Sequence, residues 1–196
     1  MSAVADAIAD IYSLGHRNVL QAVAELNEDQ MRWRPPRSNS IAFNLWHIAR
    51  WADHMQSVVG AMTPRLRQRL GTSDQIWTRD ALSTKWDFPA GELGAAETGM
   101  GMDEDASAQL TLPPKEELVG YAARAFDAAD RAIREVREDD LARDAEFDPA
   151  TVPWATPSDY GTVANWIIAG IRHEARHLGM IEALKGAVGL RGTATR

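Results

Sequence analysis

Apolar side chains recur at three- and four-residue steps in four segments of the chain, which is the spacing expected of helices with one buried face. These segments cover residues 4–26, 41–59, 118–136 and 163–181, and the last pattern fades at Gly186. The strict alternation of apolar and polar residues that marks a β-strand is nearly missing. The sequence therefore predicts an all-α fold, for which a four-helix bundle is the simplest arrangement.

The apolar positions also predict which face of each helix is buried. In the first segment we expect the core to receive Val4, Ile8, Ile11, Gly15, Val19, Ala22 and Leu26. In the second segment the expected positions are Ile41, Leu45, Ile48, Ala52, Met55 and Val59. The third and fourth segments contribute Leu118, Ala122, Ala125, Ala129, Ala132, Val136, Val163, Ile167, Gly170, Ile171 and Ile181.

The connections between these segments differ in length. Ser38 or Ser40 can cap the second helix, Pro114 suits the first turn of the third, and the fourth opens near residues 158–162. The first connection is short, whereas the second covers about residues 61–112. A connection that long is usually a lid, a crossover or a stretch with short helices, and a crossover permits a bundle other than up-down-up-down. Residues 144–158, which include Trp154, link the last two helices.

Composition restricts the class of protein. The 196 residues suit a single domain, 1–196, and 21 basic against 28 acidic residues give a net charge of −7. An acidic balance argues against nucleic acid or an anionic membrane as partner. The absence of cysteine excludes disulfides, thiolate metal sites and a cysteine nucleophile. Because no apolar run approaches a membrane span and the start lacks a basic signal-peptide region, we expect a soluble cytoplasmic protein.

Histidines supply the candidate chemistry. His173 and His177 lie four residues apart, so their imidazoles project from one face of the fourth helix, and that face is largely apolar. The second helix places His47 and His54 on a comparable face. Burying several neutral imidazoles without partners is costly, and a bound metal ion would remove that cost. The alternative for each histidine is a hydrogen-bonded position in the core.

The sequence from His173 to His177 also matches the His-Glu-x-x-His pattern of zinc metalloproteases, in which the glutamate is the general base. Those enzymes need a third ligand further along the chain, either a glutamate well downstream or a histidine six residues after the second one. Only 19 residues follow His177, and none of them is a histidine. A metalloprotease is therefore disfavoured. Glu174 is expected to point about 100° around the helix from His173, toward a flanking salt bridge or a contact that supports the ligands.

Two segments resemble one known family. The stretch Ser40-Ile41-Ala42-Phe43-Asn44-Leu45-Trp46-His47-Ile48-Ala49-Arg50-Trp51-Ala52-Asp53-His54 resembles the second helix of DinB-like proteins. The helix with His173-x-x-x-His177 resembles the final metal-binding helix of that family. The resemblance implies an up-down-down-up four-helix bundle that often forms homodimers. It also implies a divalent metal ion held by three side chains, which by position are His47, His173 and His177.

Three histidine ligands leave at least one coordination position open, as in catalytic zinc sites. Zinc or nickel is the expected ion, with iron, manganese and cobalt as alternatives, because the ligand set alone does not choose among them. The open position can activate a water or hold a substrate thiol as its thiolate. Since the chain has no cysteine, an external thiol would supply the sulfur in the second case.

Other polar residues are weaker candidates for a catalytic role. His54 lies two turns beyond His47 and is a general base, a supporting group or a core histidine. Arg50 and Asp53 are three residues apart and are expected to form a surface ion pair, unless Arg50 contacts an anionic substrate. Glu174 would be the general base in a hydrolase. His16 is not expected to be a ligand.

Three functions therefore stand as hypotheses. Some DinB-like proteins are transferases or isomerases that use mycothiol, bacillithiol or glutathione, so the resemblance implies a small-molecule transferase or isomerase with a low-molecular-weight thiol as cosubstrate. A metal-dependent hydrolase that uses bound water is the second hypothesis. A non-catalytic metal-binding protein of the stress response is the third. The expected partners are a small-molecule substrate and a second copy of the chain, with neither nucleic acid nor membrane.

Overall fold

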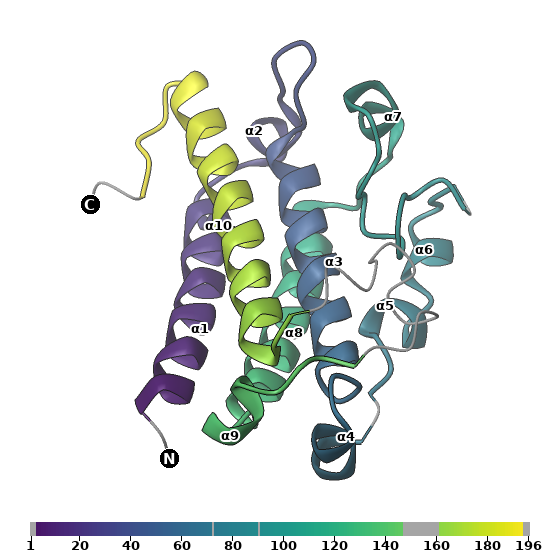
Figure 1. Ribbon diagram of the computed structural model, residues 1–196. Coiled ribbons are helices and arrows are strands. Elements are labelled where there is room, and N and C mark those ends of the chain that lie inside the picture. The colour runs from purple at the N-terminus through teal and green to yellow at the C-terminus, as the bar shows by residue number, and fades with distance from the viewer. Residues whose placement is uncertain (1–2, 72, 90, 147–160, 194–196) are drawn as a thin grey trace.

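The computed structural model describes residues 3–71, 73–89, 91–146 and 161–193, and each regular element within these ranges is a helix. Four helices are long: α1 (Ala3–Ala24), α3 (Ile41–Val59), α8 (Lys115–Arg134) and α10 (Val163–Ala187). Both α1 and α3 pack against α8 and α10. In Figure 1, α1 and α10 run in one direction and α3 and α8 in the opposite direction. The prediction of an all-helical fold is confirmed for the described part of the chain.

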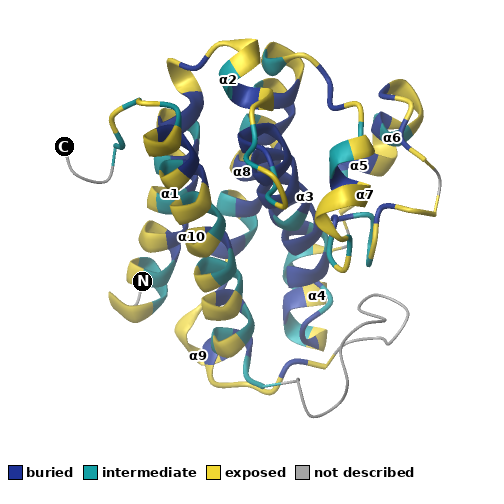
Figure 2. Ribbon diagram, turned by 90° about the horizontal axis from the view of Figure 1, so that it is seen from above, coloured by how far each residue is buried: buried dark blue, intermediate teal, exposed yellow. Residues whose placement is uncertain are grey.

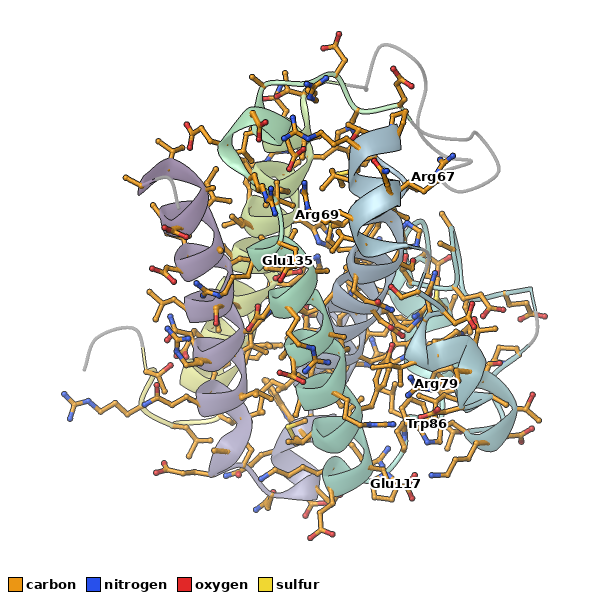
Figure 3. All side chains as sticks on the ribbon, turned by 90° about the horizontal axis from the view of Figure 1, so that it is seen from below. Arg67, Arg69, Arg79, Trp86, Glu117 and Glu135 are labelled. Atoms are coloured by element: carbon orange, nitrogen blue, oxygen red, sulfur yellow. The ribbon has the colours of Figure 1, made fainter. Side chains whose placement is uncertain are left out.

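Short helices fill the connections. In the described ranges they are α2 (Glu28–Arg32), α4 (Pro64–Leu70), α5 (Ile76–Arg79), α6 (Leu82–Lys85), α7 (Glu104–Gln109) and α9 (Glu138–Leu141). The long connection between α3 and α8 thus contains α4 to α7, and Figure 1 shows α5, α6 and α7 on the side of α3 away from α1. At this side Trp86 and Glu117, labelled in Figure 3, join the connection to α8 through a 3.2 Å hydrogen bond.

Side-chain caps fix where α3 and α10 begin. Ser40, rather than Ser38, accepts a hydrogen bond from the Phe43 amide at the start of α3. Thr162 accepts one from the Asn165 amide at the start of α10. Each cap pairs one of the amides that the first turn of a helix leaves without an intrahelical acceptor. Most of the connection before α10, with Trp154, lies outside the described residues.

α3 is the central helix of the molecule. In Figure 2 it is buried along almost its whole length, because α8, α10 and the long connection pack around it. The apolar face predicted for this helix is buried as expected. Its other faces are buried too, although they carry polar side chains: Asn44, His47, Arg50, Asp53, His54 and Gln56. Since a buried polar group is costly without a partner, each of these residues must find one inside the protein.

The buried face predicted for the first segment is confirmed at Val19, Ala22 and Leu26, but the prediction was wrong in the N-terminal half of α1. Val4 and Ile11 are 53% and 54% exposed, whereas Tyr12 and His16 are buried. The apolar pattern misled because two polar aromatic side chains decide the rotation of this helix. Tyr12 and His16 both contact Glu174 of α10, and those contacts require them to face inward. None of the described helices is both long and apolar enough to cross a membrane.

Candidate metal centre

The structure brings His47 of α3 together with His173 and His177 of α10. One ring nitrogen from each histidine lies within 4.8 Å of the other two, and the Nε2 atoms of His47 and His173 are 3.2 Å apart. Two nitrogens at ~2.0–2.1 Å from one tetrahedral zinc ion lie ~3.3–3.4 Å from each other. The spacing of His47 and His173 therefore suits two ligands of one ion.

A backbone carbonyl fixes the tautomer of His47. The Nδ1 atom of His47 hydrogen bonds to the carbonyl oxygen of Thr98. Because a carbonyl oxygen can only accept, Nδ1 carries the proton and Nε2 presents its lone pair to His173 and His177. A metal-binding histidine commonly donates its other N–H to such an acceptor, which sets the orientation of the ring.

A chain of three groups fixes the tautomer of His177 in the same way. The side-chain amide nitrogen of Asn44 donates to the Ser40 carbonyl over 2.8 Å, so the amide oxygen faces the other way. That oxygen lies 2.8 Å from Nδ1 of His177. Nδ1 of His177 is therefore the donor, and its Nε2 lone pair also faces the cluster. Asn44 thus acts on His177 as the Thr98 carbonyl acts on His47.

The surroundings keep the three imidazoles neutral. Burial, together with the positive charge that His177 and His173 would carry, lowers the pKa of His47 from 6.5 to about 3. Burial and nearby arginines lower the pKa of His173 to about 4, and burial and His173 lower that of His177 to about 4. All three histidines are thus unprotonated at neutral pH, which is the form that binds a metal ion.

The loop that supplies the Thr98 carbonyl approaches α3 very closely at Gly99. A Cβ atom at Gly99 would lie 2.7 Å from Trp46 and 3.2 Å from Nδ1 of His47, and the φ angle of this residue is +86°. Both facts require glycine at this position, because a side chain would clash and the backbone lies in the left-handed region. Gly99 therefore lets the loop lie close enough for its carbonyl to orient His47.

The arginine and aspartate candidates on α3 form their expected ion pair, but the expectation of a surface pair was wrong. Arg50 and Asp53 are 1% and 0% exposed, and Nη1 of Arg50 lies 3.3 Å from Oδ2 of Asp53. Asp53 also accepts hydrogen bonds from the amides of Ile76 and Trp77. The pair is buried because the long connection folds over this part of α3 and offers its backbone groups as partners.

Glu174 points away from the three histidines, toward α1. Its Oε1 accepts a 3.0 Å hydrogen bond from the Tyr12 hydroxyl, and its Oε2 lies 3.0 Å from Nε2 of His16. The other ring nitrogen of His16 lies 2.7 Å from Asp130. The structure thus places Glu174 and His16 in a second cluster, where Glu174 serves a buried histidine of α1.

His54 is buried next to the three clustered histidines without joining them. Its Nδ1 lies 3.2 Å from the side-chain nitrogen of Gln75, and its ring packs edge-on against Trp51 at 5.8 Å. Trp51 in turn contacts the ring of His173 at 5.2 Å. Burial, followed by the charge of Arg50, lowers the pKa of His54 to about 4. His54 is therefore a neutral neighbour of the three-histidine cluster.

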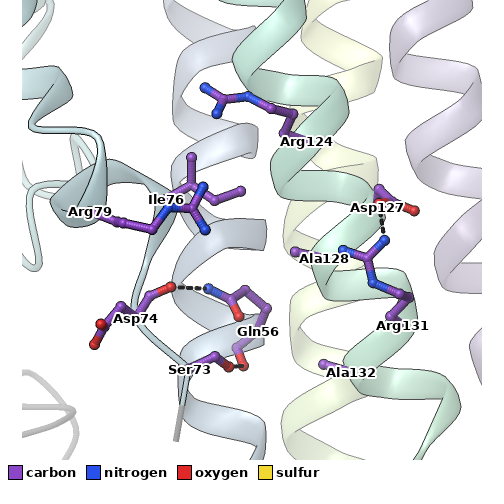
Figure 4. A pocket seen from close by; sticks show the side chains of 10 residues that line it. All are labelled: Gln56, Ser73, Asp74, Ile76, Arg79, Arg124, Asp127, Ala128, Arg131 and Ala132. Carbon is purple, nitrogen blue, oxygen red and sulfur yellow. Dashed lines mark hydrogen bonds and ion pairs between the residues drawn. The ribbon is translucent and has the colours of Figure 1, made fainter.

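A separate hollow in the structure has a different chemical character from the three-histidine cluster. This hollow of about 430 Å³ lies between α8 and the segment that leads into α5, and charged and polar side chains line it together with Ile76, Ala128 and Ala132 (Figure 4). Arg131 pairs with Asp127 there, and Gln56 bonds to the Asp74 carbonyl. None of the three clustered histidines lines it.

The sequence analysis did not identify the two groups that orient His47 and His177, namely the Thr98 carbonyl and Asn44. Asn44 lies three residues before His47, so a polar residue on the same buried helix was a local signal for it. Thr98 had no such signal, because a backbone carbonyl acts whatever the side chain is. Gly99 was the one hint, since a glycine in a connecting segment often marks a close backbone approach.

Comparison with known proteins agrees with the fold. A crystal structure described as a conserved protein from Enterococcus faecalis is similar with a TM-score of 0.69 and 16% sequence identity, and the match covers 94% of this chain and 96% of the other. A search of curated proteins finds no significant match. The family profile of the DinB superfamily matches residues 12–181, a range that includes all three clustered histidines. The chain therefore belongs to the DinB superfamily.

Proposed function

We propose that this protein is a metal-dependent enzyme whose divalent ion, zinc or nickel, is held by His47, His173 and His177. The observation that carries the proposal is the convergence of three neutral imidazoles, two of which have their lone pairs directed by a protonated Nδ1. Without a cation, facing lone pairs at 3.2 Å repel unless His173 donates a proton to His47. A divalent ion would satisfy all three nitrogens at once.

The three histidines would hold the ion in different ways, because each has different neighbours. His47 is the rigid ligand, since it is buried on α3 and anchored to Thr98. His177 is held by Asn44, and His173 lies against Trp51 at the half-buried side of the cluster. When bound, the ion would supply Lewis acidity and an open coordination position for a ligand from solution.

We further propose that this ligand is a low-molecular-weight thiol such as mycothiol, bacillithiol or glutathione, and that the reaction is a transfer or isomerisation of a small molecule. The absence of cysteine supports an external thiol. The position of Glu174 also favours a thiol over a hydrolytic water, because both carboxylate oxygens of Glu174 face α1 residues. A hydrolase of the His-Glu-x-x-His type needs that carboxylate at the ion.

Metal binding is tested first by titrating zinc and nickel into the metal-free protein and into His47→Ala. We expect one ion per chain for the wild type and loss of that binding in His47→Ala. Asn165→Ala is the matched control, since Asn165 is exposed on α10 two turns before His173 and carries no charge. Equal affinity of the wild type and His47→Ala would refute the proposed site.

The thiol is tested with the metal-loaded protein. Thermal unfolding is followed with each of the three thiols, and an electrophilic substrate panel is assayed with and without thiol. Stabilisation by a thiol that disappears in His47→Ala is the expected result. Hydrolysis that needs metal but no thiol would replace the transferase with a hydrolase.

Two assembly features belong to the same proposal. We infer the up-down-down-up bundle from the opposed directions of the long helices in Figure 1. We also infer a homodimer, because Ile11, Leu14 and Ile168 expose 54%, 48% and 49% of their surface on the adjacent helices α1 and α10. Sedimentation of wild type and Leu14→Glu across micromolar concentrations tests the dimer, and a wild-type mass of 21.6 kDa throughout would exclude it.

A further inference from the structure

The loop before α7 contains two adjacent residues in an unfavourable backbone conformation. Ala96 and Glu97 have φ angles of +50° and +53°, in the left-handed region that favours glycine. A turn of hydrogen bonds surrounds them, because the amides of Glu97 and Thr98 donate to the carbonyls of Gly94 and Ala95. Non-glycine residues in such a conformation persist only where the surroundings hold them, and they cluster at functional sites.

Arg50 is the group that holds these two residues. Its Nη2 donates to the Ala96 carbonyl over 2.9 Å, and its Nε donates to the Glu97 carbonyl over 2.8 Å. The remaining N–H groups bond to Asp53, Tyr121 and Gln75. The five donors of the guanidinium thus meet five acceptors, which leaves Arg50 fixed in one geometry.

The same loop then reaches the metal site within one residue. Thr98 follows Glu97 directly, and its carbonyl is the acceptor that orients His47. His47 and Arg50 are three residues apart on α3, so one turn of this helix presents the imidazole of His47 and the guanidinium of Arg50 to the same loop. Glu97 is held a second time, because its carboxylate accepts a 2.6 Å hydrogen bond from the Trp77 indole.

We propose that Arg50 is a positioning residue for the metal site: by clamping the Ala96 and Glu97 carbonyls it holds the Thr98 carbonyl against His47 and so directs Nε2 of His47 to the ion. The inference rests on the proposed metal site for its effect on affinity. Its first step, the tautomer of His47, does not depend on any metal. Arg50 is 1% exposed and its N–H groups are all bonded to other residues than the three histidines, so it acts on His47 through the loop.

A planar guanidinium is required for this role. Lysine keeps the positive charge beside Asp53, but its single ammonium group cannot reproduce the divergent donors that reach two successive carbonyls. Arg50→Lys therefore separates charge compensation from clamping. We expect this variant to fold with the pair to Asp53 retained and with the loop released.

The test reads the ring nitrogens of His47 by long-range ¹H–¹⁵N NMR in the metal-free wild type, in Arg50→Lys and in Arg69→Lys. Arg69 is the matched control, because it also pairs with a fully buried aspartate, Asp140, but joins α4 to α9 (Figure 3). We expect a protonated Nδ1 in the wild type and in Arg69→Lys. In Arg50→Lys we expect a mixture of tautomers and rapid exchange of that proton.

Zinc affinity is then measured for the same three proteins. Loss of a group that orients a ligand typically lowers metal affinity about 10- to 100-fold, and we expect that loss in Arg50→Lys alone. If folded Arg50→Lys keeps the wild-type tautomer of His47 and the wild-type zinc affinity, the proposal is overturned, and Arg50 only stabilises the fold. A shifted tautomer in Arg50→Lys, with no zinc binding even in the wild type, would instead refute the proposed function and keep the positioning role.

If Arg50→Lys does not fold, Gln75→Ala takes its place. Gln75 is a half-buried acceptor for Nη2 of Arg50, so its removal loosens the clamp without removing the guanidinium. Faster exchange of the His47 Nδ1 proton than in the wild type is expected. Unchanged exchange, or a wild-type His47 protonated on Nε2, would overturn the proposal.

Discussion

Two histidine clusters share α10 but behave in opposite ways. On one side, His173 and His177 meet His47 with no carboxylate among them, and burial leads the causes that lower the pKa of all three to about 3 or 4. On the other side, Glu174 meets His16 of α1. Burial also disfavours the charged form of His16, but the carboxylates of Glu174 and Asp130 outweigh burial and raise its pKa to about 9.

The difference shows that the neighbours, rather than the depth of burial, decide the charge of a histidine. His16 is 2% exposed and His47 is 5% exposed, yet one is a cation at neutral pH and the other is neutral. A compensated cation such as His16 contributes to the fold. Uncompensated neutral imidazoles are suited to receive a cation from solution.

The largest expected effect comes from His177→Ala. Removing a ligand should lower zinc affinity by more than the roughly 10- to 100-fold that loss of a supporting group costs. Stability of the metal-free protein should change by only about 1 kcal/mol, because the half-buried imidazole loses one hydrogen bond, the one to Asn44. Calorimetric titration and urea unfolding measure the two quantities. Unchanged zinc affinity would contradict the site.

Glu174→Ala should have the opposite pattern, with a large loss of stability and little change in zinc affinity. It leaves a buried, charged His16 facing one carboxylate fewer, and breaking a buried pair costs about 3–5 kcal/mol of stability. Zinc affinity should stay within a few-fold of the wild type, because Glu174 lies off the ligand side of α10. Urea unfolding at pH 7 and zinc titration of the folded variant test both parts. Loss of zinc comparable to that in His177→Ala would mean that the two clusters are coupled through α10.

The pH dependence of stability should report both clusters at once. The pKa of His16 is about 9 when folded and 6.5 when unfolded, so its stabilisation is complete below pH 6.5 and is lost as the pH rises toward 9. The full loss is on the order of 3 kcal/mol, at 1.36 kcal/mol for each pKa unit. The lowered pKa values of the metal-site histidines act in the acid range, where stability falls from pH 6.5 toward 4.

Urea unfolding of the metal-free protein between pH 4 and 9 should therefore show a maximum near pH 6.5. Saturating zinc provides the control. It should raise stability near neutral pH and steepen the acid limb, since protons compete with the ion, while the loss between pH 6.5 and 9 should be unchanged. A flat curve above pH 6.5 would show that His16 is not held as a cation.

The smallest expected effect is that of Asn44→Ala. This variant keeps all three ligands but removes the acceptor that fixes the tautomer of His177. Zinc affinity should fall about 10- to 100-fold, less than in His177→Ala. Zinc titration of Asn44→Ala and His177→Ala under the same conditions separates the loss of a ligand from the loss of a group that orients a ligand. Equal losses in both would make Asn44 as important as a ligand.

The sequence determined much of the fold because its helices carry strong apolar periodicity. The buried face of α3 and the all-helical class followed from spacing alone, and the i, i+4 pair of His173 and His177 follows from helix geometry. The juxtaposition of His47 with them came from family resemblance. The prediction failed in the N-terminal half of α1, where Tyr12 and His16 face inward because both contact Glu174.

Tertiary structure alone decided which polar groups surround each histidine. Arg50 and Asp53 suggested a surface pair because charged residues at i, i+3 usually form one. They are buried because residues 75–77 and 96–97 pack against α3 and supply hydrogen-bond partners. The Thr98 carbonyl cannot be recognised in a sequence, since every residue has one and only packing selects which one meets His47. Helix periodicity is a local property and can be read along the chain. Charge compensation depends on groups more than 100 residues apart, such as His16 and Asp130, and is settled only when the helices meet.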